Sequence, residues 1–243
     1  MPTALIRSRA QIGMSAPEVV IEVHLSAGLP AFNIVGLPEK AVRESRDRVR
    51  SALLNNGFAM PIKRITVNLA PADLPKQGGR YDLPIAIGLL VAAKVVAQKQ
   101  VDNYELIGEL GLLGDLRSCP SVLAMALACQ QSQHALIVPR CNLEQAALVK
   151  DLTLYAAEQL VEVVAHLQGI QVLPIQSVGI LSEPVKQTVD MSDVAGHAVA
   201  KQALVVAAAG GHSVLMQGAP GSGKSMLAQR VPSILPALTF SQA

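Results

Sequence analysis

The first part of the chain contains stretches in which hydrophobic and polar residues alternate, the pattern typical of half-buried β-strands. Between Val19 and Leu25 every second residue is a valine, isoleucine or leucine, whereas Glu22 and His24 fall on the opposite face. Ala4–Arg9 is predicted to pair with this stretch as a hairpin. Further strands are predicted over Ala31–Val35, Ile65–Leu69, Ala135–Val138 and Leu152–Tyr155.

Helices are predicted between these strands, where apolar residues recur every three or four positions or form runs bounded by helix-starting and helix-ending residues. They cover Glu39–Asn55, Asp82–Ala97, Val122–Gln131, Leu143–Val149 and Ala157–Leu167. Asp82 is expected to be the N-cap of the second helix. Because strands and helices alternate along the chain, the pattern favours one α/β domain over this part.

Proline, glycine and scattered polar residues interrupt the pattern over residues 169–189, which predicts a linker. A second unit is predicted from Asp190 onwards. It begins with a helix over Ala198–Ala209 that ends at two glycines, followed by a buried strand over Ser213–Gln217. A further helix is predicted from Met226 to Val231.

The helix Glu39–Asn55 carries a stripe of arginines beside its buried face. Arg43, Arg46 and Arg50 fall within about 60° of one another, given about 100° per residue. A solvated face with salt bridges is the commoner explanation of such a stripe. The functional alternative is that the three arginines contact the phosphates of DNA.

Composition narrows the class of protein. Hydrophobic residues make up 51% of the chain and aromatic residues only 2%, so the core must consist of alanine, valine, leucine and isoleucine. The net charge of +2 is too small to indicate nucleic-acid binding by itself. Cys119, Cys129 and Cys141 form no paired motif, which favours reduced thiols in a cytoplasmic protein. No signal peptide or membrane span is expected.

The strongest chemical signal follows the predicted strand Ser213–Gln217. The sequence there fits the phosphate-binding template G-x-x-x-x-G-K-[ST] at every fixed position. It reads Gly218-Ala219-Pro220-Gly221-Ser222-Gly223-Lys224-Ser225. In such a loop the backbone N–H groups surround the phosphates, the lysine reaches the β- and γ-phosphates, and the serine hydroxyl binds Mg²⁺. The loop therefore predicts binding of ATP with Mg²⁺.

The surroundings of this loop resemble a known module. Asp193–Leu238 contains Val194-Ala195-Gly196, a stretch of small residues before His212, the phosphate loop and Ile234-Leu235-Pro236. It is similar to the start of the AAA+ module of the magnesium-chelatase type. This resemblance implies that Val194 belongs to the cofactor-binding residues, together with the loop itself.

The region in front of the linker resembles the Lon-protease-like domain found at the front of the ComM/YifB family. Gly108–Gly114 and Pro139–Asn142 match segments of the Lon pattern. The loop Pro75–Asp82 corresponds to the nucleophile loop, but Arg80 stands in the place of the catalytic serine. The catalytic lysine falls on Leu123. The resemblance therefore implies the scaffold without its Ser–Lys dyad.

The two resemblances together predict an α/β protein in three parts. A catalytically degenerate Lon-like α/β domain covers residues 1–168, a linker 169–189, and the first part of a P-loop AAA+ α/β domain 190–243. Membership of the ComM/YifB family implies a homo-hexameric, ATP-driven motor that moves DNA branch points during natural transformation. An acidic Walker B residue, a sensor residue and an arginine finger would lie past Ala243. We therefore expect this chain to be an N-terminal portion without the hydrolysis machinery.

Two other functions are compatible with parts of the sequence. A magnesium chelatase subunit, which couples ATP hydrolysis to insertion of the metal into a porphyrin, shares the AAA+ features but is not expected to carry the Lon-like domain. A peptidase would need another nucleophile, for which Ser118, Cys119 and Ser121 are candidates with His134 as the base. Nothing in the sequence brings these four residues together.

Overall fold

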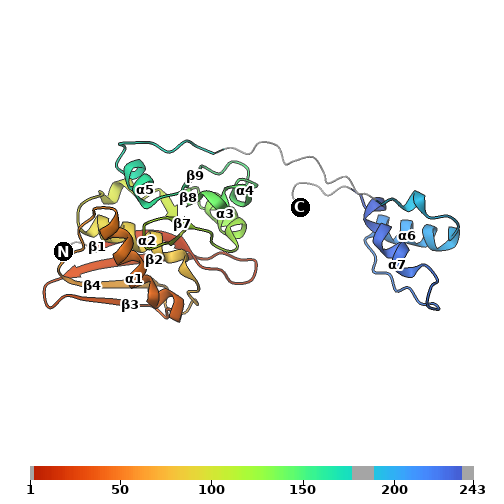
Figure 1. The fold of residues 1–243 in the computed structure, drawn as a ribbon, viewed down its shortest axis with the longest axis horizontal. Helices are drawn as coiled ribbons and strands as arrows, with labels where there is room; N and C mark the ends of the chain where they lie inside the picture. Colours follow the sequence, from red (N-terminus) through yellow and green to blue (C-terminus); the bar gives the residue numbers. More distant parts are fainter. Residues whose placement is uncertain (1–2, 177–188, 237–243) are drawn as a thin grey trace. The chain divides into compact units, whose positions relative to one another are not determined.

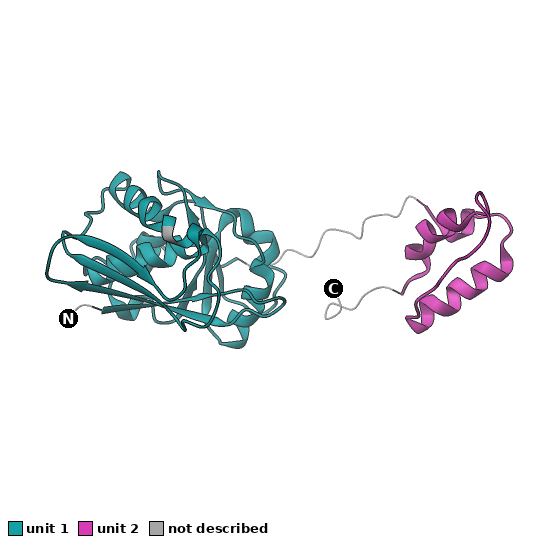
Figure 2. Cartoon of the chain, turned by 90° about the horizontal axis from the view of Figure 1, so that it is seen from below, with its two compact units in different colours: residues 1–180 teal, residues 181–243 magenta. Residues whose placement is uncertain are grey.

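The computed structural model describes residues 3–176 and 189–236. The chain separates into two compact units, residues 1–180 and 181–243 (Figure 2). The predicted linker over 169–189 lies partly outside the described residues, so its bounds and those of the two predicted domains stay predictions.

The first unit is built on a seven-stranded mixed sheet with the strand order β3-β4-β2-β1-β5-β8-β9 (Figure 1). The strands are β1 Thr3–Arg9, β2 Glu18–Ser26, β3 Ala31–Val35, β4 Arg64–Ala70, β5 Tyr104–Leu106, β8 Ala135–Pro139 and β9 Leu154–Ala157. β2 pairs antiparallel with both β1 and β4, and the remaining neighbours pair in parallel. The predicted α/β class is therefore confirmed, with strand β5 as an addition that the sequence pattern did not indicate.

Helices cover both faces of the sheet at its β8–β9 end. The helices of this unit are α1 Lys40–Asn55, α2 Asp82–Ala92, α3 Val122–Gln131, α4 Leu143–Ala146 and α5 Leu160–Leu167. Ile137 belongs to the core that α1, α2 and α5 share, whereas its neighbours Leu136 and Val138 belong to the core beneath α3 and α4. Strand β8 is therefore apolar on both faces. A small hairpin, β6 Glu109–Leu110 and β7 Leu116–Arg117, pairs separately from the main sheet.

Three predicted helix ends are wrong, and two of them, both in α2, have local reasons. α2 ends at Ala92 and not at Ala97, because Lys94 adopts a left-handed backbone with φ of 65° that interrupts the helix. Asp82 is not the N-cap of α2 but its first residue, since its carboxylate accepts hydrogen bonds from Arg48 and from the backbone of Leu110. The helix after β8 is also shorter than predicted and ends at Ala146.

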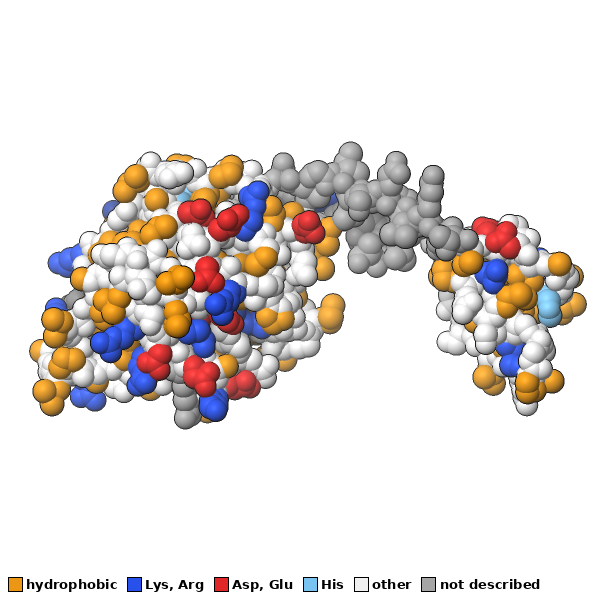
Figure 3. Space-filling view, in the orientation of Figure 1, with side chains coloured by type: hydrophobic (Ala, Val, Ile, Leu, Met, Phe, Trp, Pro, Cys, Tyr) orange, Lys and Arg blue, Asp and Glu red, His pale blue; other side chains and the backbone are white. Residues whose placement is uncertain are grey.

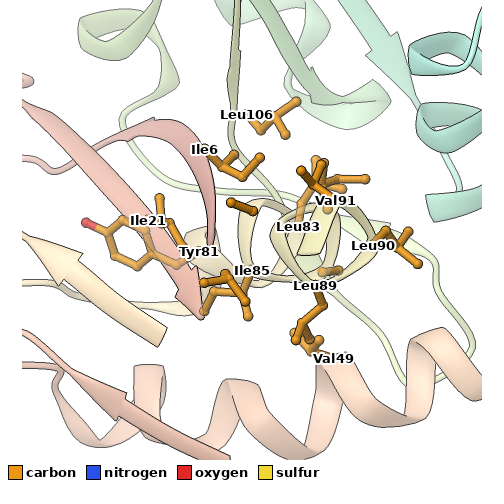
Figure 4. Packing of buried hydrophobic residues seen from close by; sticks show 14 of the residues in the cluster. Ile6, Ile21, Val49, Tyr81, Leu83, Ile85, Leu89, Leu90, Val91 and Leu106 are labelled. Atoms are coloured by element: carbon orange, nitrogen blue, oxygen red, sulfur yellow. The ribbon is translucent and has the colours of Figure 1, made fainter. Parts of the chain in front are cut away.

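Helix α2 lies at the centre of the first unit. All of its 11 residues are buried, and it packs on β1, β2 and α1. Figure 4 shows Leu89 of α2 next to Val49 of α1. Gly88 allows the close approach to the sheet, because a Cβ at this position would lie 2.6 Å from Cγ2 of Val23.

The second unit contains α6 Ala198–Gly210 and α7 Lys224–Arg230, with short 3₁₀ turns at Met191–Asp193 and Val231–Ile234. Its small core consists of Met191, Val194, Leu204 and Leu227. The predicted strand Ser213–Gln217 is not formed. A strand needs a neighbour to satisfy its backbone N–H and C=O groups, and no described segment pairs with this one. Leu215 is consequently 93% exposed.

No described helix is long and apolar enough to cross a membrane.

We predict that Gly88→Val lowers the free energy of unfolding by at least about 2 kcal/mol, because the added side chain overpacks the contact between α2 and β2. Urea unfolding followed by far-ultraviolet circular dichroism measures this change. Val23→Ala removes the methyl group that the new side chain meets, so the double variant should recover about 1 kcal/mol relative to additivity. Strictly additive effects would contradict the close approach.

Candidate nucleotide-binding site

The glycine-rich loop lies between an extended segment and the first residue of α7. Gly221 and Gly223 adopt left-handed backbone conformations, with φ of 80° and 79°. Residues with a Cβ rarely adopt such values, so both glycines are needed for the turn itself, and Gly223 is one of the two glycines that the template fixes. The loop and the following helix are thus formed, whereas the preceding strand of the template is not.

Lys224 holds this loop closed from within. Its Nζ donates to the carbonyl oxygens of Gly218 and Ala219, at 2.8 and 2.7 Å, and lies 3.2 Å from Oγ of Ser222. The ammonium group is therefore positioned over the loop, where it is the cation that a phosphate would meet. Ser225 follows it, exposed, in the first turn of α7.

Val194 lies in the small core of the second unit, and its role in cofactor binding stays a prediction. Its side chain is only 3% exposed and packs in the small core of the second unit. The Val194 carbonyl accepts a hydrogen bond from Nζ of Lys201. The segment after it does reach the loop, since Nε2 of His197 would lie 3.2 Å from a Cβ at Gly223. Sequence reasoning missed His197, whose only signal was the preceding Gly196.

The predicted arginine stripe lies at the edge of a hollow on α1. Arg46 and Arg50 are exposed, and both line a hollow of about 620 Å³, whereas the side chain of Arg43 lies outside the described ones. Arg46 forms an ion pair with the adjacent Asp47, at 3.1 Å. This hydrogen bond lowers the pKa of the Asp47 carboxyl. The hollow also includes Lys63, which is distant in sequence and which sequence reasoning missed.

The loop that corresponds to the Lon nucleophile loop is packed into the core. Arg80 is 4% exposed, and its Nη1 lies 3.7 Å from Sδ of Met125 on α3, while its Nε has no hydrogen-bond partner. Leu123, also on α3, is 37% exposed. Neither side chain can activate a nucleophile, because a guanidinium remains protonated and leucine has no titratable group.

Asp82, two residues further, joins three elements instead of taking part in a reaction. Nε and Nη2 of Arg48 on α1 donate to its two carboxylate oxygens, at 2.6 and 3.1 Å. The N–H of Leu110 in β6 donates to the same carboxylate at 3.2 Å. Burial raises the pKa of Asp82, and the hydrogen bond from Arg48 opposes this shift. The pair is a structural link between α1, α2 and the hairpin.

Cys119 and Ser118, two of the alternative nucleophiles, are held by one asparagine. Oδ1 of Asn142 accepts from the backbone N–H of Cys119 at 2.8 Å, and Nδ2 donates to Oγ of Ser118 at 3.2 Å. Burial raises the pKa of the Cys119 thiol to about 12. At neutral pH the thiolate that would act as nucleophile is therefore nearly absent. Ser121, the third candidate, has a left-handed backbone with φ of 63° at the start of α3.

His134, the candidate base, belongs to a separate network. Its Nδ1 bonds to Oε1 of Glu105 at 2.9 Å, and Arg9 donates to both oxygens of the same carboxylate at 2.6 Å. The Glu105 side chain is fully buried, and Arg9 also donates to Oγ of Ser132. None of these hydrogen bonds involves Cys119, Ser118 or Ser121, so the structure does not assemble the nucleophile–base pair of the peptidase alternative.

The described part of the chain contains no cluster of three or more histidine, cysteine, aspartate or glutamate side chains that could hold a metal ion. A Mg²⁺ ion at the glycine-rich loop would therefore need the nucleotide's phosphate oxygens beside the Ser225 hydroxyl.

Comparison with known proteins matches both units to related families. Residues 21–142 match the family described as subunit ChlI of Mg-chelatase, and residues 190–243 match the family described as magnesium chelatase, subunit ChlI. The first match lies in the first unit and covers half of the chain. The second match covers the unit that contains the glycine-rich loop. Both units are therefore assigned to a family.

Relatives extend the match to the whole chain. The chain is 48% identical over 247 aligned residues to the competence protein ComM of Haemophilus influenzae, which covers 100% of this chain and 48% of the relative. It is 44% identical to the YifB proteins of Salmonella typhimurium and Escherichia coli, again over its whole length. The chain spans about half the length of these curated relatives. Two segments of the chain match models of the ChlI subunit of magnesium chelatase, and by its similarity over its whole length it belongs to the ComM/YifB family.

Proposed function

We propose that the chain is the N-terminal part of an ATP-driven motor that acts on branched DNA. The observation that carries the ATP-binding part of this proposal is the position of the Lys224 ammonium over the loop carbonyls of Gly218 and Ala219. Backbone carbonyls are weak partners for an ammonium compared with a phosphate group. Incoming ATP would draw the ammonium from the carbonyls towards its β- and γ-phosphates.

The loop residues then have separate roles. The backbone N–H groups of 218–225 surround the phosphates, with Gly221 and Gly223 keeping the loop in shape. Ser225 offers its hydroxyl to the Mg²⁺ that accompanies the nucleotide. His197, beside Gly223, is placed to shield one side of the loop. The Val194 side chain contributes by packing in the small core of the second unit, to which Leu227 of α7 also belongs.

We further propose that residues 190–243 are the first part of an AAA+ module and that residues 1–168 form a Lon-like domain without peptidase activity. Arg80 and Leu123 stand where the Lon nucleophile and lysine would act, and neither can replace them. Ring formation as a homo-hexamer, the arrangement expected for an AAA+ motor, would bring the missing charge-stabilising arginine from a neighbouring subunit.

DNA is the substrate that we propose. The relative from Haemophilus influenzae carries the name of a competence protein, and the similarity extends over the whole of this chain. Metal insertion into a porphyrin is the second candidate, because both matching families carry the name of the chelatase subunit. The two functions share ATP binding at residues 218–225 and differ in what the rest of the protein contacts.

For the chain 1–243, we predict that ATP with Mg²⁺ binds and that Lys224→Ala weakens this binding about 10- to 150-fold, the value of a hydrogen bond to a charged group. Isothermal titration calorimetry measures the affinity. Lys99→Ala removes an exposed lysine from the other unit and is the matched control. Equal affinities of the Lys224 and Lys99 variants would refute nucleotide binding at this loop.

The same chain is predicted to release phosphate no faster than its Lys224→Ala variant. Among the described residues no acidic side chain is bonded to the loop, so no carboxylate is placed to orient an attacking water. Turnover that depends on Lys224 would mean that a complete site forms within this chain or between its copies.

For the complete protein that contains this chain, we expect ATP-dependent strand displacement on a labelled three-way DNA junction, abolished by Lys224→Ala. Metal insertion into a porphyrin, followed by its absorption spectrum, is expected to be absent. The reverse result, insertion without strand displacement, would replace the DNA proposal by the chelatase one.

The absence of a cysteine nucleophile can be checked directly. With iodoacetamide at about pH 8, the native chain should be labelled at Cys141, which is exposed, and not at Cys119, whose thiol has its pKa raised to about 12 by burial. Mass spectrometry after unfolding in urea should find all three cysteines labelled. Fast native labelling of Cys119 would show that this thiol is activated.

A further inference from the structure

The hollow on α1 has an apolar floor. It lies between the second half of α1, the start of β3 and the segment that leads into β4, and its volume is about 620 Å³. Phe32, Met60 and Ile65 line it and pack against the main core of the first unit. A volume of this size falls in the range of ligand pockets, about 300 to 1,000 Å³. We call it the α1 groove.

The rim of the α1 groove is cationic. Arg46, Arg50 and Lys63 line it, and Asp47 is the one carboxylate among the lining residues, so their net charge is +2. Figure 3 shows Lys and Arg side chains among hydrophobic ones on the displayed face of the first unit. The groove therefore suits a ligand that combines negative charges with a flat apolar part.

The spacing of the two arginines fits a strand of phosphates. Arg46 and Arg50 are four residues apart on α1, so both lie on one face with a rise of about 6 Å between them. This separation lets the two guanidinium groups contact successive phosphates of an extended strand. Arg46 can leave Asp47 for a phosphate, because their ion pair is exposed to solvent and therefore weak.

The floor distinguishes an unpaired base from a base pair. In a duplex the bases are stacked on one another, and only their edges are accessible in the grooves. An unpaired base can instead stack its face on an aromatic ring. Proteins that bind single strands use this kind of contact. Phe32 is the aromatic ring of the α1 groove, and there are only three phenylalanines in the whole chain.

We propose that the α1 groove binds single-stranded DNA, with one base against Phe32 and the neighbouring phosphates on Arg46, Arg50 and Lys63. This inference rests on the proposed function for the choice of DNA as the polyanion. It adds that the first unit holds the unpaired strand that a moving branch point exposes. An acidic peptide with an apolar side chain is the competing ligand. The experiment must distinguish its binding from that of single-stranded DNA.

The test uses the full chain 1–243 and an oligothymidylate of about 12 nucleotides that contains one 5-iododeoxyuridine. Fluorescence anisotropy gives the affinity over a range of salt concentrations, and mass spectrometry locates the photo-cross-link. We expect the cross-link at Phe32 and tighter binding of the single strand than of a duplex of equal length. Phe32→Leu should weaken binding about tenfold with an unchanged salt slope, whereas Phe32→Tyr should retain it.

The double variant Arg46→Gln/Arg50→Gln should reduce the slope of log K against log salt by about 1.4, since each single-strand phosphate contact contributes about 0.7. Arg117→Gln/Arg140→Gln is the matched control. It also removes two exposed arginines, one of them paired with a nearby aspartate as Arg46 is. The control is expected to leave slope and affinity unchanged.

Several results would overturn the inference. These are equal binding by the Phe32→Leu and Phe32→Tyr variants, equal slopes for the two double variants, a preference for duplex, or displacement of the strand by polyglutamate at equal charge. ATP binding is measured on the same samples. Loss of ATP binding with intact strand binding refutes the nucleotide proposal alone, and the reverse refutes the α1 groove alone.

Discussion

The complete burial of helix α2 is the constraint on which the first unit depends. A helix that is apolar on all sides is stable only if every side is covered. The residues of α2 meet this condition by packing on β1 and β2 on one side and on α1 on another. The antiparallel hairpin β1–β2 therefore has to lie in the middle of the sheet, and Gly88 has to be small enough for the helix to reach Val23.

Two carboxylates buried inside this unit are each paired with an arginine. Glu105 and Asp82 are both fully buried, and they pair with Arg9 and Arg48 respectively. Leaving such a carboxylate without its partner costs far more than an exposed pair contributes. These pairs lock elements that are distant in sequence. A scaffold of this kind can support binding surfaces, such as the α1 groove.

The second unit depends more on local contacts than on a large core. Among its described residues the core cluster has four buried side chains, while Val199, Val206 and Leu215 are exposed. The glycine-rich loop still closes, because its shape depends on local backbone conformations and on the hydrogen bonds of Lys224. The segment Ser213–Gln217 does not become a strand, because a strand depends on a partner and not on its own residues. The glycine-rich loop therefore forms in this unit, although no described segment pairs with Ser213–Gln217.

The sequence by itself determined the local features of this protein. Alternation located β1, β2, β3 and β4, periodicity located α1 and α3, and the template located the loop at 218–225, because each signal lies within a few consecutive residues. Tertiary structure alone decided which distant residues meet: Lys63 joining Arg46 and Arg50, Arg48 with Asp82, and His197 beside Gly223. It also decided that Asp82 is a buried link and not a helix cap, and that Ser213–Gln217 is no strand. Side-chain contacts across the fold and pairing between strands depend on the arrangement of the whole chain, and no short stretch of residues encodes them.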